Sequence, residues 1–259
     1  MLKMKNLVGW PLIILFLFST CKKNDQDELC SGFTDEVYEY SIYQCTQADS
    51  IDCSHKVLES VLLPERYLKC CSTDSLLRSC LVYPFLGTIW AYSTLQYGYE
   101  RVLANFNGFN ELFIRSDVNI CLINAYREMD PEDVGDFSKP ADIGEFMSRF
   151  TFIELTIAQF QLIEKLKANE TKMLLEICLD KLSTKSNLSC YGIIGEMSLL
   201  AIMARVLYSQ DYKPFVDQLI NIPNLLAFIE SADLLGIDNV DEVKQFILNN
   251  TGDYLEAIK

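Results

Sequence analysis

The sequence predicts an all-α protein, a helical bundle or irregular stacked helix pairs, with a disulfide-tied cysteine-rich N-terminal segment. From Gly87 onward, apolar residues recur at steps of three and four, which is the period of an amphipathic helix. No run alternates apolar and polar residues as a half-buried strand does. Six of the ten cysteines lie between Cys30 and Cys80, a density typical of a disulfide framework.

Length and composition indicate a globular protein. The chain has 259 residues, of which 50% are hydrophobic and 22% charged, enough to form one large domain or two small ones. The predicted organisation is a signal peptide (1–20), a polar tether (21–29), a cysteine-rich and aromatic-rich helical part (30–130), an acidic linker (131–140) and a second helical part (141–259).

The first twenty residues have the three parts of a secretory signal. Lys3 and Lys5 precede an apolar run of 12 residues, Leu7 to Phe18, which is followed by small residues. As a helix this run would measure roughly 18 Å at about 1.5 Å per residue, against a bilayer core of about 30 Å. The segment therefore predicts export rather than a stable membrane span, with a buried N-terminal helix as the alternative.

The end of the signal carries a resemblance to a known class. Phe18-Ser19-Thr20-Cys21 resembles the lipobox of bacterial lipoproteins, and the polar residues 22–28 are similar to their tether. The resemblance implies that Cys21 is diacylated, becomes the new N-terminus and anchors the protein to the envelope membrane. Phe18 and Thr20 depart from the family pattern, which prefers Leu and then Gly, Ala or Ser at these positions. Cleavage without lipidation, giving a secreted protein, is the alternative.

The cysteines predict bridges but not their connectivity, because six cysteines allow 15 pairings. Cys70 and Cys71 are expected to pair with different partners, since bridge geometry disfavours a bond between neighbours. Cys178 and Cys190 form a plausible local pair, which leaves Cys121 over. The disulfide candidates are Cys30, Cys45, Cys53, Cys70, Cys71, Cys80, Cys178 and Cys190.

The cysteine-rich part has a less regular pattern than the rest. Residues 57–62 predict a short helix that Pro64 stops. The aromatic-rich stretch 83–99 fits one long helix or a hairpin, and the helix is favoured because no tight-turn dipeptide interrupts it. Residues 130–140 contain two prolines and four acidic residues, which predicts the linker.

Five apolar stripes predict helices in the second part. They cover residues 143–163, 174–182, 199–207, 225–235 and 240–247. The third helix is led by Gly192 and the fourth starts near Pro223. Asp238 is the expected N-cap of the fifth helix, with Asp241 three residues on in an arrangement close to a capping box.

A second resemblance covers residues 196–250. The segments 199–208, 224–237 and 243–248 resemble the C-terminal helices of BTB/POZ domains, the fold of Kelch-type adaptors. This resemblance implies an intracellular protein-interaction adaptor, which is the alternative to an exported protein. Stacked helix pairs of the HEAT type are a structural alternative.

The charge balance limits the kinds of partner. The chain has 36 acidic and 22 basic residues and a net charge of −14. Removal of residues 1–20 would take away Lys3 and Lys5 and no acidic residue, which gives −16. Such a surface repels phosphate backbones, so no nucleic-acid partner is expected. It favours a basic protein partner through electrostatic steering.

Sequence motifs provide no basis for an enzyme. His55 is the single histidine, no Cys-x-x-Cys pair occurs, and neither a Gly-x-Ser-x-Gly elbow nor a Walker A loop is present. No catalytic residue, metal or cofactor is therefore predicted. The expected function is a non-enzymatic, protein-binding or structural role at the cell envelope or outside the cell. A thiol-based redox enzyme is a third hypothesis, which requires a cysteine of lowered pKa.

Overall fold

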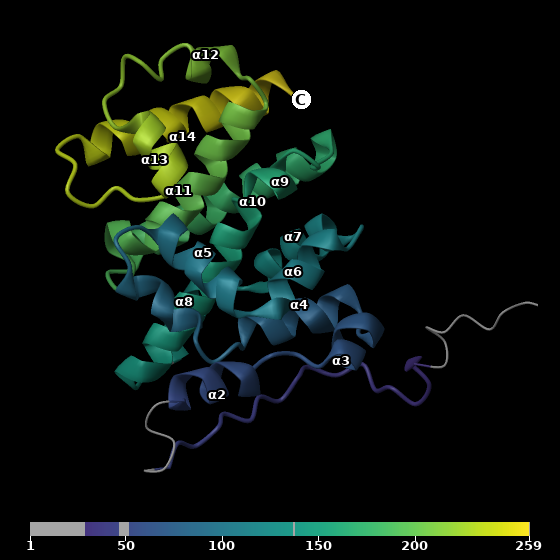
Figure 1. The fold of residues 1–259 in the computed structure, drawn as a ribbon. Helices are drawn as coiled ribbons and strands as arrows, with labels where there is room; N and C mark the ends of the chain where they lie inside the picture. Colours follow the sequence, from purple (N-terminus) through teal and green to yellow (C-terminus); the bar gives the residue numbers. More distant parts are fainter. Residues whose placement is uncertain (1–28, 47–51, 137, 259) are drawn as a thin grey trace, which may run out of the picture.

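The computed structural model describes residues 29–46, 52–136 and 138–258, and this part of the chain is helical with no strand. The predicted all-α class is thus confirmed (Figure 1). The N-terminal half contains α2 (Cys53–Ser60), α3 (Glu65–Cys70), α4 (Thr73–Leu81), η2 (Leu86–Ala91), α5 (Leu95–Asn105), α6 (Asn107–Ile114), α7 (Val118–Glu128) and η3 (Pro131–Asp136). The C-terminal half contains α8 (Pro140–Ile157), α9 (Phe160–Ile163), α10 (Ala168–Asn187), α11 (Gly192–Ser209), α12 (Lys213–Val216), α13 (Leu225–Ser231) and α14 (Val240–Ala257).

Helix α11 is the centre of the fold. Every residue from Gly195 to Leu207 is buried, because α8, α10 and α14 pack around it. A helix with apolar residues on most of its faces is stable only when it is enclosed in this way. Among the described helices, α11 alone has the length and hydropathy of a membrane span, and 72% of it is buried inside the protein.

Arg205 fastens α13 to this central helix. Its guanidinium is buried and donates to the carbonyl oxygens of Ile229 (2.7 Å), Glu230 (3.0 Å) and Ala158 (3.2 Å), and to the side chain of Gln96 (2.9 Å). The three carbonyls lie at the C-terminal ends of α13 and α8, where helix dipoles favour a cation. Burial lowers the pKa of Arg205 to about 10, so the side chain stays charged at neutral pH.

The first described residues cross the outside of the N-terminal helices. Residues 29–46, here called the strap, have little regular secondary structure and run beneath α2, α3 and α4 (Figure 1). Disulfides hold both ends of the strap: Cys30 is bonded to Cys70 at the end of α3, and Cys45 is bonded to Cys53 at the start of α2. The prediction of a disulfide-tied N-terminal segment is confirmed for these four cysteines.

Four of the disulfide candidates are thiols in the structure: Cys71, Cys80, Cys178 and Cys190. The expected pairing of Cys178 with Cys190 is wrong, because Cys178 is buried inside α10 while Cys190 is exposed beyond its end. Asn187, the last residue of α10, lies nine residues after Cys178, which is roughly 13 Å along the helix at about 1.5 Å per residue, whereas bridged Cα atoms lie within about 7 Å. Cys71 and Cys80 belong to the apolar core instead. Cys121 is also a thiol, as expected for the cysteine left over.

Two predicted long helices are each interrupted. The stretch 83–99 forms η2 and then α5, separated at Thr94, whose side chain accepts from the amide of Tyr97 and caps α5. The stripe 143–163 is divided between α8 and α9 at Gln159, whose backbone is extended. The Gln159 side chain donates back to the carbonyl oxygen of Leu155 at 2.7 Å, so the break is held by a hydrogen bond. In each stretch the apolar pattern continues across the break, because the helices on both sides of it face the core.

Two further expectations differ in detail. The N-cap of α14 is Asn239 rather than Asp238. The acidic segment 131–140 holds the 3-10 helix η3, in which Pro131 and Val134 are buried, followed by the start of α8. Tyr191 donates to the carbonyl oxygen of Pro131 at 3.0 Å. The buried apolar residues form a single cluster on both sides of this segment, so it does not separate two cores.

Candidate functional site

A groove of about 810 Å³ lies where the strap meets the main body. Its walls come from the strap, the turn between α4 and η2, the first half of α8 and the start of α11. The lining residues are Tyr38, Tyr40, Leu81, Val82, Tyr83, Pro84, Leu86, Gly87, Trp90, Gly144, Glu145, Met147, Ser148, Arg149 and Ile194. We refer to this set as the groove.

Aromatic contacts fix one wall of the groove. The ring of Tyr83 stacks on Phe106 with a centroid distance of 4.1 Å. Tyr40 meets Tyr83 edge to face at 6.0 Å, and Tyr38 meets Tyr40 in the same way at 5.1 Å. Edge-to-face pairs are the preferred geometry of such rings. The strap tyrosines are therefore packed against the body rather than free in solvent.

The opposite wall carries the groove's tryptophan. The indole Nε1 of Trp90 donates to Ser148 Oγ at 3.0 Å, and Ser148 Oγ donates to the carbonyl oxygen of Gly144 at 2.7 Å. The indole N–H is thus satisfied, while Trp90 remains 39% exposed. Its orientation is set by α8 and its apolar surface borders the groove.

Arg149 is the one basic side chain in the groove, whose residues all belong to the described part of the chain. Its Nη2 atom pairs with Glu145 Oε1 at 2.7 Å, one turn earlier on α8. Its Nε atom is buried and makes no hydrogen bond to any described residue. A buried donor without a partner costs about 1–3 kcal/mol, which an acceptor that reached this atom after a side-chain movement would offset.

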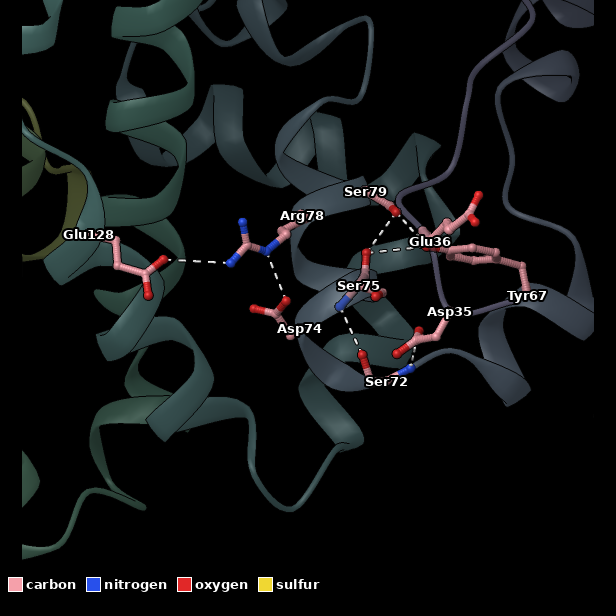
Figure 2. A network of polar contacts seen from close by, with 9 residues as sticks. All are labelled: Asp35, Glu36, Tyr67, Ser72, Asp74, Ser75, Arg78, Ser79 and Glu128. Atoms are coloured by element: carbon pink, nitrogen blue, oxygen red, sulfur yellow. Dashed lines mark hydrogen bonds and ion pairs between the residues drawn. The ribbon is translucent and has the colours of Figure 1, made fainter. Parts of the chain in front are cut away.

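A polar network holds the strap in place (Figure 2). The Tyr67 hydroxyl donates to the carbonyl oxygen of Glu36 at 2.7 Å and lies 2.6 Å from Ser79 Oγ. The amide of Tyr38 donates to the same Ser79 Oγ at 2.8 Å. The strap is therefore bonded through its backbone to side chains of α3 and α4, which puts Tyr38 at the edge of the groove.

The strap also completes the start of α4. The Asp35 carboxylate accepts from the amide of Ser72 at 2.9 Å, and this hydrogen bond lowers the pKa of Asp35. Ser72 in turn caps α4 by accepting from the amide of Ser75 at 3.1 Å. Figure 2 shows these residues beside Arg78, which pairs with Asp74 and Glu128 on the outer face of α4.

Burial raises the pKa of two tyrosines in the groove. Desolvation raises the pKa of Tyr83 to about 12 and raises the pKa of Tyr40 further. Both hydroxyls therefore stay protonated at neutral pH, and Tyr40 donates to the carbonyl oxygen of Ser79 at 3.0 Å. The groove presents neutral aromatic walls and one ion pair, between Arg149 and Glu145.

Four of the described thiols have a raised pKa. Burial raises the pKa of Cys71, Cys80, Cys121 and Cys178, which keeps these side chains as thiols rather than reactive thiolates. These shifts are opposite in direction to the one that the redox hypothesis requires.

The other predicted site residues lie away from the groove or outside the described residues. Cys21, the predicted lipidation site, falls in the part of the chain that the structure does not describe. His55 is exposed on α2, and its Nδ1 atom lies 3.4 Å from Oε2 of Glu59, one turn later. In residues 29–46, 52–136 and 138–258, no three His, Cys, Asp or Glu side chains gather where they could hold a metal ion.

The sequence pattern does not predict the groove. Its residues are scattered from Tyr38 to Ile194, and only the tertiary fold brings them together. Two signals pointed toward it: the aromatic-rich stretch 83–99 and the paired tyrosines Tyr38 and Tyr40 between two cysteines. Neither pattern alone specifies that these side chains share a wall.

Comparison with protein-family models, with curated proteins and with solved structures finds no match to this chain.

Proposed function

We propose that this chain is an exported, lipid-anchored, non-enzymatic protein with a protein-binding or structural role at the cell envelope or outside the cell. The observation that carries the proposal is the strap, which is bonded at both ends by the disulfides Cys30–Cys70 and Cys45–Cys53. Disulfides persist in oxidising compartments and are rare in the cytosol. The strap also follows directly on the predicted signal and tether, where an anchored protein would leave the membrane.

Charge supports a binding role with a basic partner. The full chain carries a net charge of −14, and the strap exposes Asp35, Glu36 and Glu39. An acidic surface steers a basic protein toward it and raises the association rate more than the final affinity. Association with such a partner is therefore expected to slow as the salt concentration rises.

Acylation of Cys21 is the direct test of the anchor. The chain is expressed in its own host with an alkyne-tagged fatty acid, and the label and the membrane fraction are measured. We expect the wild-type chain to carry the label and to sediment with membranes, and the variant Cys21→Ser to lose both. Cys190→Ser is the matched control, because Cys190 is an exposed thiol in the described part of the chain. Equal labelling of Cys21→Ser, or an unlabelled wild-type chain, would contradict the anchor.

The intracellular BTB/POZ-like adaptor is the second candidate. In its favour, α11 packs against both α13 and α14 in the region of the resemblance, and five cysteines of the described residues are thiols. Buried thiols also occur in exported proteins, so their presence alone does not decide between the two. The adaptor requires an unprocessed chain with every cysteine reduced, which an intact-mass measurement with thiol alkylation detects.

A further inference from the structure

We infer that the groove binds a small amphipathic carboxylate, with its apolar body along the aromatic walls and its anionic group at Arg149. This goes beyond the proposed protein-binding or structural role and does not depend on export. The groove volume of about 810 Å³ lies within the range of roughly 300–1,000 Å³ that small-molecule sites occupy.

The walls suit an apolar body. Trp90 and Met147 offer ring and thioether surface, and Ile194 is 42% exposed at the start of α11. Burial of such surface releases water and stabilises a complex by roughly 25 cal/mol for each Å² of apolar area covered. The hydrogen bond from Trp90 to Ser148 holds the indole in place before any ligand enters. A ligand therefore meets a preformed apolar surface.

Arg149 selects the anionic group. Glu145 takes only its Nη2 atom and leaves the buried Nε atom without an acceptor. A guanidinium binds a planar carboxylate through two parallel N–H donors, so a ligand carboxylate that displaces Glu145 engages Nη2 and, once the side chains covering it move, the unpartnered Nε. The Glu145 side chain is 66% exposed, so it can move into solvent while the ligand carboxylate takes its place. An alcohol of the same chain length has no negative charge, so it cannot replace the Glu145 carboxylate at Arg149.

The test uses the full chain with Trp10→Phe, which leaves Trp90 as the single tryptophan and thus a reporter within the groove. The probes are dodecanoate and 1-dodecanol below their aggregation limits, and their binding is followed by Trp90 fluorescence. We expect dodecanoate to bind more tightly than dodecanol. Arg149→Gln should weaken dodecanoate roughly tenfold or more, the loss expected for a hydrogen bond to a charged group, and leave dodecanol unchanged. Arg149→Lys should retain part of the preference for the acid.

Two further variants separate the groove from general hydrophobic binding. Ile194→Trp adds bulk inside the groove and should weaken both probes, although its second tryptophan requires calorimetry as the readout. Ile220→Ser is the matched control, because Ile220 is 94% exposed and lies outside the groove. Circular dichroism and the melting temperature verify that each variant is folded. Unchanged dodecanoate affinity in folded Arg149→Gln would overturn the inference, and so would a loss in Ile220→Ser equal to that in Ile194→Trp.

Discussion

Glu154 and Lys185 form an ion pair sealed inside the protein. Their side chains are 0% and 1% exposed, and Lys185 Nζ lies 2.7 Å from Glu154 Oε1. Tyr126 and Ser198 donate to the same carboxylate at 2.8 and 2.5 Å, while Lys185 also donates to the carbonyl oxygen of Gly195. The network joins α7, α8, α10 and α11. Loss of one partner alone would leave an unpaired charge in the core, which is more costly than the absence of the whole pair.

Lys185→Met is expected to lower the free energy of unfolding by about 3–5 kcal/mol, since it leaves Glu154 buried without its cation. The double variant with Glu154→Leu should recover part of that loss. Urea unfolding followed by circular dichroism measures both. Lys69→Met is the control, because Lys69 pairs with Glu65 in solvent and its loss should leave stability nearly unchanged. A Lys185→Met chain as stable as Lys69→Met would contradict this interpretation of the core.

Tyr83 makes stability sensitive to high pH. Burial raises its pKa to about 12 from 10.0, so below pH 10 both folded and unfolded chains hold the proton. Between these values the unfolded chain loses the proton and the folded chain keeps it, so the free energy of unfolding falls as pH rises. Tyr83→Phe should reduce that fall and change little at pH 7. Urea midpoints measured from pH 7 to 11 test it, and an unchanged pH dependence in the variant would contradict it.

At the scale of elements, the strap is the part that the disulfides control. Cys30–Cys70 spans a sequence separation of 40 and Cys45–Cys53 one of 8. Because a longer closed loop restricts the unfolded chain more, replacing both cysteines of the first bridge with serine should cost roughly 1 kcal/mol more than replacing those of the second. Thermal unfolding compares the two double variants. The opposite order would contradict a loop-entropy account of the bridges.

Hydrogen exchange at the strap gives an independent readout. The amide of Tyr38 is bonded to Ser79 Oγ, so it should exchange slowly in the wild-type chain. Loss of the Cys30–Cys70 bridge should speed this exchange, while amides at the centre of α11 remain protected. The same rate at Tyr38 with and without the bridge would show that the polar network alone holds the strap.

Helix periodicity predicted most elements, since burial of an apolar stripe determines both the sequence pattern and the packing. The breaks at Thr94 and Gln159 were not predicted, because each depends on one side chain that bonds a nearby backbone group. The pairing of Cys30 with Cys70 follows from the path of the strap, which no local pattern records. The groove was missed for the same reason, as its strap and α8 residues meet only in the folded chain.

At the scale of the whole molecule, one continuous core predicts one cooperative unit. Buried residues from Val61 to Ile247 belong to a single cluster. Helix α11 contacts the helices that precede it, α8 to α10, and those that follow it, α12 to α14. Thermal unfolding should therefore give the same midpoint by circular dichroism and by Trp90 fluorescence in the Trp10→Phe chain. Two separated transitions would indicate independent units on either side of residues 131–140.

The central claim is that an exported chain acquires its two strap disulfides while its remaining thiols stay free. The most direct measurement is the intact mass of protein purified from its own host, alkylated under denaturing conditions before and after reduction. We expect loss of residues 1–20, acyl groups on Cys21, five alkylated thiols before reduction and nine after it. A full-length, unmodified chain with ten alkylated thiols before reduction would contradict it and favour the intracellular adaptor.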